Sequence, residues 1–328
     1  MPLPLLARVP ALASLPRAVL GVYPSPVVRL DVGDGRPLWV KRDDLDDPVL
    51  GGNKVRALEF LLGGVGEGDL VLTLGGEGST HVLATALHAR RLGAGTRAVR
   101  WPHDMSDVAR VVARRIETVC EAAPVLPAPL AVARLIGWRL RAGAGRPARF
   151  VPLGGSAPLG VLGHVNAALE LADQVAAGEL PAPRQVVVPL GSGGTAAGLA
   201  LGFALAGLDT TVVAARVGPR LGATGGRARR LAAATRRLVR ARTGVELPPP
   251  VAVRVVHDVY GGAYGRELPA GTRAAELLRD LLAVRLDATY SAKACAAALA
   301  LAASGPGPVL FWLTFDGRWL GEKEWSVG

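Results

Sequence analysis

A chain of 328 residues has the length of one large or two moderate domains, and because 50% of its residues are hydrophobic it has ample material for a buried core. Its net charge is +11, yet nearly all of the basic side chains are arginine, and the only lysines are Lys41, Lys54, Lys293 and Lys323. The excess of arginine, alanine and glycine indicates a coding bias, so the charge by itself does not identify a nucleic-acid partner.

Short apolar stretches alternate with longer helical patterns along the chain. After an apolar, proline-punctuated arm with a short helix over residues 1–26, strands are predicted at 37–41, 70–74, 97–101, 148–152, 185–189, 210–217, 251–256 and 308–313. Helices are predicted to begin near Asn53 and to occupy 79–92, 104–121, 159–177, 195–206, 225–242, 272–282 and 292–303. This alternation predicts an α/β fold of mostly parallel sheets covered by helices. The glycine-rich segment 142–149 is the predicted seam between two domains, with a return crossing near Gly51.

Several features bear on location and partners. Cys120 and Cys295 are too few for a disulfide framework, and the first residues lack a basic region followed by an apolar run and a cleavage site, so we expect a protein of the reducing cytoplasm. The uncharged segment 185–208 is interrupted by Pro189 and glycines, which predicts a buried strand, a glycine loop and a buried helix, and no membrane association. The arginine-rich segment 216–242 lacks interleaved aromatic residues, so it is interpreted as a solvated helix face and no nucleic-acid partner is expected.

The most informative stretch, residues 40–60, reads VKRDDLDDPVLGGNKVRALEF. Gly51 and Gly52 lead to Asn53 and Lys54, where a helical pattern begins. An ammonium group at a helix N-terminus faces the positive end of the helix dipole, which favours the neutral amine that Schiff-base chemistry needs. The glycines would let backbone and cofactor approach closely. The alternative is an ordinary surface lysine, and the motif alone does not decide between the two.

A second motif, VVVPLGSGGTAAGL at residues 186–199, joins an apolar strand to a glycine turn and a helix start. Successive N–H groups in such a turn form an anion-binding concavity, to which the hydroxyls of Ser192 and Thr195 add donors. The motif matches neither the phosphate loop of NTPases nor the dinucleotide fingerprint. With a Schiff-base lysine it indicates a monophosphate cofactor that carries an aldehyde, and a tight packing turn is the alternative.

A third motif, LGGEGSTHVLA at residues 74–84, places Ser79, Thr80 and His81 at another helix start. Hydroxyl and free N–H groups there suit the carboxylate that every amino-acid substrate carries. The alternative is that Ser79 only caps the helix and His81 is exposed.

In this order, the motifs resemble those of the fold-type II pyridoxal-phosphate enzymes, in the group that contains 1-aminocyclopropane-1-carboxylate deaminase and D-cysteine desulfhydrase. The resemblance covers nearly the whole chain and rests on KRDD at 41–44, GGNK at 51–54, STH at 79–81, GGS at 154–156, GSGGT at 191–195, the tyrosine at 264 and YSAK at 290–293. It implies a two-domain fold like that of the tryptophan synthase β subunit. Residues 1–54 and 146–328 would form the large cofactor-binding domain, and residues 55–145 the small domain.

The resemblance also implies a role for each motif, with pyridoxal 5'-phosphate as cofactor, a small amino acid as substrate, no metal and a homodimer. The catalytic residues that it implies are Lys54, Ser79, Tyr264 and Tyr290. The cofactor-binding residues that it implies are Lys54, Asn53, Thr80, Gly191, Ser192, Gly193, Gly194, Thr195, Ser291 and Thr314. The substrate-binding residues that it implies are Ser79, Thr80, His81, Tyr264 and Tyr290.

The chain departs from these relatives in two places. Residues 78–81 read Gly-Ser-Thr-His where family members usually carry Gln-Ser-Asn-His, so Thr80 replaces the asparagine that is expected at the cofactor's phenolic oxygen. Residues 313–316 read Leu-Thr-Phe-Asp where relatives have His-Thr-Gly-Gly or His-Leu-Gly-Gly. The first departure predicts that the cofactor ring is held differently from that of the relatives. The second predicts a different floor to the substrate pocket.

Two positions bear on the reaction. Ring-opening members of the family resemble one another in having Glu after the tyrosine and Leu in the C-terminal motif, whereas desulfhydrase-like members have small hydroxyl residues, as this chain does at Ser291 and Thr314. A hydroxyl beside the pyridine nitrogen leaves it largely neutral, which favours loss of a β-substituent. The predicted reaction is α,β-elimination on a small amino acid, as in D-cysteine desulfhydrase. Alternatives are 1-aminocyclopropane-1-carboxylate deaminase, a β-replacement enzyme and a catalytically silent cofactor-binding protein.

Overall fold

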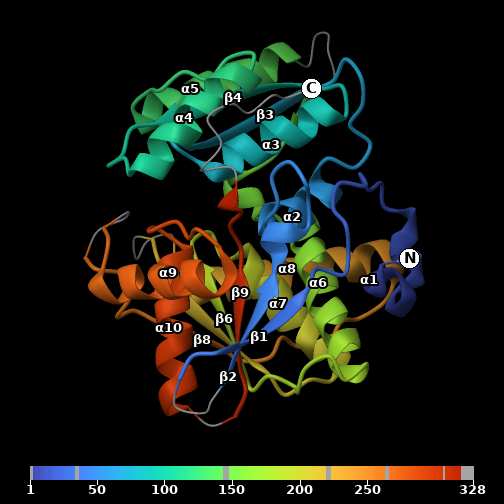
Figure 1. The fold of residues 1–328 in the computed structure, drawn as a ribbon. Coiled ribbons are helices and arrows are strands. Elements are labelled where there is room, and N and C mark those ends of the chain that lie inside the picture. Colours follow the sequence, from blue (N-terminus) through green and yellow to red (C-terminus); the bar gives the residue numbers. More distant parts are fainter. Residues whose placement is uncertain are drawn as a thin grey trace.

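Two sheets organise the chain, and they lie in the lower and upper lobes of Figure 1. The computed structural model describes residues 3–33, 37–142, 148–218, 223–262, 266–305 and 307–318. The larger sheet contains, in spatial order, β1 (Val27–Asp31), β2 (Pro37–Arg42), β9 (Val309–Leu313), β6 (Gln185–Leu190), β7 (Thr211–Arg216) and β8 (Val253–Val256). The smaller sheet has the order β4 (Gly95–Trp101), β3 (Leu70–Gly76), β5 (Ala148–Phe150). All neighbouring strands are parallel except β1 and β2, so the predicted α/β fold with mostly parallel sheets is confirmed.

Helices cover both faces of the larger sheet. One face packs against α6 (Pro158–Ala176), α7 (Gly194–Ala206) and α8 (Gly225–Thr243), and the other against α9 (Pro269–Leu282) and α10 (Ser291–Ser304). Successive residues of β6 take opposite sides, since Val186 and Val188 join the first cluster and Val187 joins the second. Burial on both sides explains why this strand reads as a continuous apolar run.

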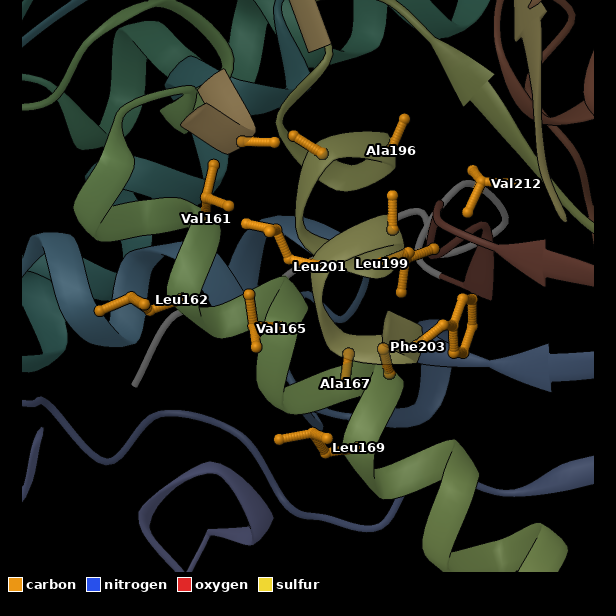
Figure 2. Packing of buried hydrophobic residues seen from close by; sticks show 14 of the residues in the cluster. Val161, Leu162, Val165, Ala167, Leu169, Ala196, Leu199, Leu201, Phe203 and Val212 are labelled. Carbon is orange, nitrogen blue, oxygen red and sulfur yellow. The ribbon is translucent and has the colours of Figure 1, made fainter. Parts of the chain in front are cut away.

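The helices α6 and α7 pack closely because α7 carries glycines at the contact. Figure 2 shows Leu201 of α7 pointing toward α6. A Cβ on Gly198 would lie 2.3 Å from the Cβ of His164, and a Cβ on Gly202 would lie 2.5 Å from the Cβ of Ala168. The segment 185–208 therefore forms a buried strand, a glycine turn and a buried helix, as predicted. Among the residues that the structure describes, no helix is long and apolar enough to cross a membrane.

The smaller sheet is also covered on both faces. The helices α3 (Thr80–Arg91) and α4 (Asp107–Val119) pack on the side of Val71 and Ala98, and α5 (Ala128–Ala142) packs on the side of Leu72 and Val99. Helix α5 and strand β1 are not predicted from the sequence. In α5, Ile136 and other apolar side chains are exposed to solvent, which obscures the helical periodicity.

The division into domains at residues 54/55 and 145/146 stays a prediction. The strand β5 after the predicted seam pairs with β3 of the smaller sheet. Helix α2 (Asn53–Leu61) lies directly on α6, because a Cβ on Gly163 would be 1.9 Å from the carbonyl oxygen of Arg56. In Figure 1, α2 lies between the two lobes. The remaining short elements are α1 (Pro4–Arg8), η1 (Pro10–Ser14), η2 (Asp43–Leu45) and η3 (Leu153–Gly155).

A buried polar cluster ties α2 to the larger sheet. Arg56 of α2 donates to both carboxylate oxygens of Asp43, at 2.9 and 2.7 Å, and from Nη1 to Glu170 of α6 at 2.9 Å. Lys41 of β2 donates to Glu170 at 2.6 Å. Burial alone raises the Glu170 pKa, but Arg56 and then Lys41 outweigh it and lower that pKa to about 2. Two cations and two carboxylates thus neutralise one another close to the start of α2.

Candidate active site

Lys54 is the second residue of α2, and its side chain is half-buried. Its Nζ donates to Oδ1 of Asn53 at 3.0 Å. Burial lowers the Lys54 pKa to about 8, against the opposing attraction of the Asp287 carboxylate. The sequence analysis predicts that the helix dipole makes this amine easier to deprotonate. In the structure, the main cause of the lowered Lys54 pKa is burial. The position of Lys54 therefore makes the neutral amine accessible near physiological pH, where an ordinary lysine is almost entirely protonated.

Gly51 and Gly52 let the chain before Lys54 lie against other backbone segments. A Cβ on Gly51 would be 2.3 Å from the carbonyl oxygen of Asp44, and a Cβ on Gly52 would be 2.6 Å from the carbonyl oxygen of Thr314. Gly52 also has a φ of +115°, which side-chain-bearing residues rarely adopt. These contacts give a reason for both glycines that does not depend on a ligand.

Replacing Gly52 by alanine should lower the free energy of unfolding by about 1–3 kcal/mol, because it combines a left-handed φ with a backbone clash. Urea denaturation followed by circular dichroism measures this. Gly137→Ala in α5 is the matched control, since apart from the adjacent backbone of α5 no atom of the described residues lies within 4 Å of a Cβ there. That control should be neutral or stabilising by up to about 1 kcal/mol. Equal stabilities for the two variants would contradict the account of Gly52.

Asn53 connects distant parts of the chain at the start of α2. Its Nδ2 donates to Oγ1 of Thr195 at 2.8 Å, and its backbone N–H donates to the carbonyl oxygen of Thr314 at 3.3 Å. All three residues are buried. The structure thus brings together three residues that the sequence analysis assigns to the cofactor, although they belong to three separate motifs.

Residues 191–195 join β6 to α7 as the sequence predicts. Gly193 has a φ of +88° and precedes the first residue of α7, whose leading N–H groups have no partner within the helix. The Oγ of Ser156 donates to the Oγ of Ser192 at 2.6 Å. The Nε of Arg227 donates to the carbonyl oxygen of Ser192 at 2.9 Å, which places a positive charge beside the loop. N–H groups, hydroxyls and a guanidinium together suit a phosphate group.

Ser79 caps α3 by accepting the N–H of Val82 at 3.4 Å, and Thr80, half-buried, is the first residue of that helix. His81 is buried, so the alternative in which it is exposed is wrong. Burial, and then the charge of Lys54, lower the His81 pKa to about 3. The imidazole is therefore neutral. It lies close to α2, since a Cβ on Gly155 would be 3.4 Å from the Cβ of Ala57 and 3.9 Å from Cε1 of His81.

A chain of hydrogen bonds determines which ring nitrogen of His81 carries the proton. The hydroxyl of Thr73 donates to the carbonyl oxygen of Val151 at 2.9 Å. Because that hydroxyl has a single proton, it accepts from Nε2 of His81 across the 3.2 Å that separates the two atoms. His81 is thus held as the Nε2–H tautomer.

Gly78 explains one departure from the relatives. A Cβ at this position would lie 2.4 Å from the carbonyl oxygen of Ala109, in the first turns of α4. The glutamine that family members usually carry here would force α4 outward. Helix α4 therefore approaches the turn before Ser79 more closely than a glutamine would allow.

The start of α10 forms another part of the site. The ring of Tyr290 lies against the glycine loop, since a Cβ on Gly191 would be 3.3 Å from its Cε1. The backbone N–H groups of Tyr290 and Ser291 donate to the two carboxylate oxygens of Asp287, at 2.6 and 3.1 Å. Ser291 is fully buried. Tyr264 lies outside the described residues.

Three residues near the predicted site are missed by the sequence reasoning. Asp287 is detectable, because an acid just before a helical pattern is a capping signal. No sequence pattern distinguishes Arg227 from the other arginines of α8. His164 lies within the apolar helix α6, where burial and then the charges of Lys54 and Arg56 lower its pKa to about 3, and no sequence pattern marks it.

Comparison with known proteins places this arrangement in a family. A family model described as "Pyridoxal-phosphate dependent enzyme" matches residues 19–314. The chain belongs to this family. The protein is therefore an enzyme, and its cofactor is pyridoxal phosphate.

Two relatives span nearly the whole chain. The chain is 38% identical over 330 residues to the nocardicin C-9' epimerase of Nocardia uniformis subsp. tsuyamanensis, covering 95% of this chain and 96% of that protein. It is 32% identical over 304 residues to the D-cysteine desulfhydrase of Salmonella choleraesuis (strain SC-B67), covering 87% and 88%. The chain is thus a fold-type II enzyme of the 1-aminocyclopropane-1-carboxylate deaminase and D-cysteine desulfhydrase family.

Solved structures agree with this fold. The crystal structure of an ACC deaminase homologue matches with a TM-score of 0.78 at 27% identity, covering 96% of this chain and 95% of that one. Threonine deaminase isoform 2 from Solanum lycopersicum matches with a TM-score of 0.63 at 15% identity, covering 95% and 84%, which supports the fold alone.

The residues of this chain fit pyridoxal phosphate. The half-buried amine of Lys54, with its lowered pKa, suits an aldehyde. Any side chain on Gly194 would start 2.7 Å from the Oγ of Ser156, so the turn keeps its backbone open beside the two hydroxyls. Ser291 supplies a buried hydroxyl and no charge at the start of α10.

Proposed function

We propose that this enzyme removes the α-proton of a small amino acid and expels a β-substituent, giving a keto acid and ammonia, the kind of reaction expected of a D-cysteine desulfhydrase. Pyridoxal phosphate supplies an electron sink for the carbanion when it is bound. The observation that carries the proposal is Lys54, whose pKa burial lowers to about 8 at the start of α2. An amine with this pKa can take up and return a proton near neutral pH.

The roles proposed for the other residues follow the geometry. Residues 191–195 and the start of α7 would hold the phosphate, and Asn53 and Thr314, which contact one another, would flank the ring together with Thr80. The start of α3 would bind the substrate carboxylate through Ser79, Thr80 and His81. Because His81 is neutral, it would act there by hydrogen bonding and packing rather than by charge.

Elimination is supported by the hydroxyl groups at Ser291 and Thr314. At the pyridine nitrogen of bound pyridoxal phosphate, a hydroxyl would not act as a proton donor in the way a carboxylic acid would. The cofactor would then be a weaker electron sink, which suits a substrate with a good β leaving group. Tyr290, which packs on the glycine loop, and Tyr264 are the proposed proton donors to the leaving group.

Epimerisation is a second candidate, because the relative named nocardicin C-9' epimerase shares 38% identity over 95% of the chain. Lys54 would perform the same first step. The proton would then return to the opposite side of the α-carbon from a second group, and the phenol of Tyr290 or the hydroxyl of Ser79 is the proposed donor.

Incubation in deuterated water separates these reactions. D-cysteine, β-chloro-D-alanine, D-alanine and 1-aminocyclopropane-1-carboxylate would each be supplied, with product analysis by chiral chromatography and mass spectrometry. Elimination predicts pyruvate from the first two substrates, with sulfide from D-cysteine. Conversion of D-alanine to α-deuterated L-alanine without keto acid would favour epimerisation instead, and 2-oxobutyrate from the cyclopropane substrate alone would contradict the roles given to Ser291 and Thr314.

A homodimer and a cytoplasmic location are further parts of the proposal. In the N-terminal arm, Leu5 and Leu12 are buried in the chain's own core, while Val19 and Val22 are 76% and 68% exposed. These two valines are the arm's contribution to a dimer surface. Light scattering measures the mass of the purified protein in solution. The wild type should have the mass of a dimer, and the Val19→Ser and Val22→Ser variants should have a lower mass.

A further inference from the structure

Arg216 is a buried cation to which the proposed reaction gives no role. It is the last residue of β7 and is 7% exposed. The sequence analysis interprets the segment 216–242 as a solvated helix face, and this is wrong for Arg216, because α8 begins only at Gly225. Arg216 lies instead at the carboxyl end of a buried parallel strand, the position at which open α/β sheets bind ligands.

The end of β7 lies beside the glycine loop at 191–195. Arg216 is paired in register with Leu190, the last residue of β6. The N–H of Val217 donates to the carbonyl oxygen of Leu190 at 3.2 Å. The guanidinium-bearing residue is therefore next to the strand end from which the loop begins.

Tyr260 connects Arg216 with a second buried cation. The Cζ atom of Arg216 lies 4.0 Å from the centre of the Tyr260 ring, and Nζ of Lys293 lies 5.8 Å from it. Lys293 is 1% exposed and donates to the carbonyl oxygen of Tyr260 at 2.9 Å. Lys293 belongs to the first turn of α10, which also places the Tyr290 ring against Gly191. Two buried cations thus share one aromatic ring close to the glycine loop.

The hydrogen bonds of Arg216 are incomplete. A guanidinium has five N–H donors. Its Nη1 donates to the carbonyl oxygen of Gly218 at 3.2 Å, whereas its buried Nε has no hydrogen-bond partner in the described part of the chain. The cation–π contact with the tyrosine ring leaves these in-plane donors unpaired.

No carboxylate of the described residues forms an ion pair with Arg216 or Lys293. Burial lowers the Lys293 pKa, and the charge of Asp287 opposes this. The oxygens of Asp287, however, already accept backbone N–H groups at the start of α10. A buried charge without a counter-ion is unfavourable, so an anion from outside the chain would complete the cluster.

We propose that Arg216, supported by Tyr260 and Lys293, forms a subsite for a phosphate group at the carboxyl end of β7. A guanidinium pairs with phosphate through two parallel hydrogen bonds, and a phosphate group carries up to two negative charges near neutral pH, which matches two cations. The group has two possible sources. One is the cofactor's phosphate, and this source rests on the role proposed for residues 191–195. The other is free inorganic phosphate bound beside the cofactor.

Pyridoxal phosphate and pyridoxal, which lacks the phosphate, test the first source. Each would be titrated into the cofactor-free full chain and followed by visible absorption. If Arg216 holds the cofactor's phosphate, Arg216→Gln should weaken binding of pyridoxal phosphate by about 10-fold or more and leave binding of pyridoxal unchanged. The matched control is Arg237→Gln, which removes an exposed arginine from α8 and should bind both compounds as the wild type does.

Inorganic phosphate tests the second source. In the cofactor-loaded enzyme the glycine loop is filled according to the proposed function, so isothermal titration calorimetry with inorganic phosphate measures a separate site. A free-phosphate site predicts binding by the wild type and by Arg237→Gln and no binding by Arg216→Gln. All three proteins should then bind pyridoxal phosphate equally.

Arg216→Lys is a second variant, because it retains the charge without the planar pair of donors. For the ligand that carries the phosphate, its affinity should lie between those of the wild type and Arg216→Gln. If a folded Arg216→Gln bound pyridoxal phosphate, pyridoxal and inorganic phosphate as the wild type does, the proposal would be wrong. Equal weakening of pyridoxal phosphate and pyridoxal would also contradict it and assign Arg216 to the fold alone. If Arg216→Gln did not fold, wild-type affinities in Arg216→Lys would overturn the proposal, and weaker binding of the phosphate-bearing ligand alone would support it.

These measurements separate the subsite from the proposed reaction. No amino acid is present in the titrations, so a selective loss of phosphate binding would stand even if neither keto acid nor epimer were formed. Formation of keto acid by the wild type, together with unchanged binding of all three ligands in Arg216→Gln, would overturn the subsite and leave the proposed function intact.

Discussion

Lys54→Ala should reduce formation of keto acid, and exchange of the substrate α-proton, by at least about 10³-fold, because the base is lost. Lys54 also provides the amine that would hold the cofactor's aldehyde. Borohydride treatment of the wild-type protein followed by peptide mass spectrometry should therefore place the cofactor's mass on Lys54. The variant should bind the cofactor without a covalent bond and lose the corresponding visible absorption band.

Arg90→Ala is the control for this prediction, because it removes an exposed cation from α3, which packs on the smaller sheet. It should retain the wild-type rate and absorption band. Circular dichroism should show that both variants are folded. More than about a tenth of the wild-type rate in Lys54→Ala, or a cofactor-derived mass on another lysine, would contradict the assignment.

Glu170→Gln should lower the free energy of unfolding by about 3–5 kcal/mol. Glu170 accepts hydrogen bonds from both Lys41 and Arg56, so the amide leaves two buried cations to share the carboxylate of Asp43. An unpaired buried charge costs far more than a lost surface contact. Urea denaturation at neutral pH measures the difference.

Asp173→Asn on the same helix is the matched control. Its carboxylate pairs with Arg8 at 2.5 Å, but the two side chains are 49% and 33% exposed. An exposed ion pair contributes at most about 1 kcal/mol, so this variant should be nearly as stable as the wild type. Equal losses in the two variants would mean that burial does not set the importance of the Glu170 cluster.

The same cluster predicts a pH dependence. The Glu170 pKa is lowered from its ordinary value of 4.5 to about 2, so its ionised form stabilises the fold fully above the ordinary value. That contribution should be lost as the pH falls from 4.5 towards 2. In Glu170→Gln, unfolding measured over this range should depend less on pH.

Much of the site was predictable because its signals are local. A glycine pair before Asn53 and Lys54 predicts a helix start, and the structure has one there. The glycine loop at 191–195 follows a buried strand and precedes a buried helix, as the apolar pattern indicates. Such signals depend on backbone dihedral preferences and on side-chain periodicity, which short stretches of sequence contain in full.

Other features became visible only in the folded chain. Gly51 lies against the carbonyl oxygen of Asp44, and Gly52 lies against that of Thr314. No local sequence pattern predicts the second contact. Asn53 bonds Thr195, which is 142 positions away. Helix α5 exposes apolar side chains, so its periodicity was misleading. Each of these depends on which segments become neighbours when the two sheets form.

The sequence by itself determined the family, the cofactor and the lysine at the start of α2, because ordered motifs carry that chemistry in their residue types. The tertiary structure decided the electrostatics of that lysine. Burial beneath neighbouring elements lowers the Lys54 pKa, and the charge of Asp287, which precedes α10, opposes this. Desolvation and charge interactions depend on three-dimensional distance and burial rather than on chain order, so they arise only when α2, α3, α6 and α10 have packed together.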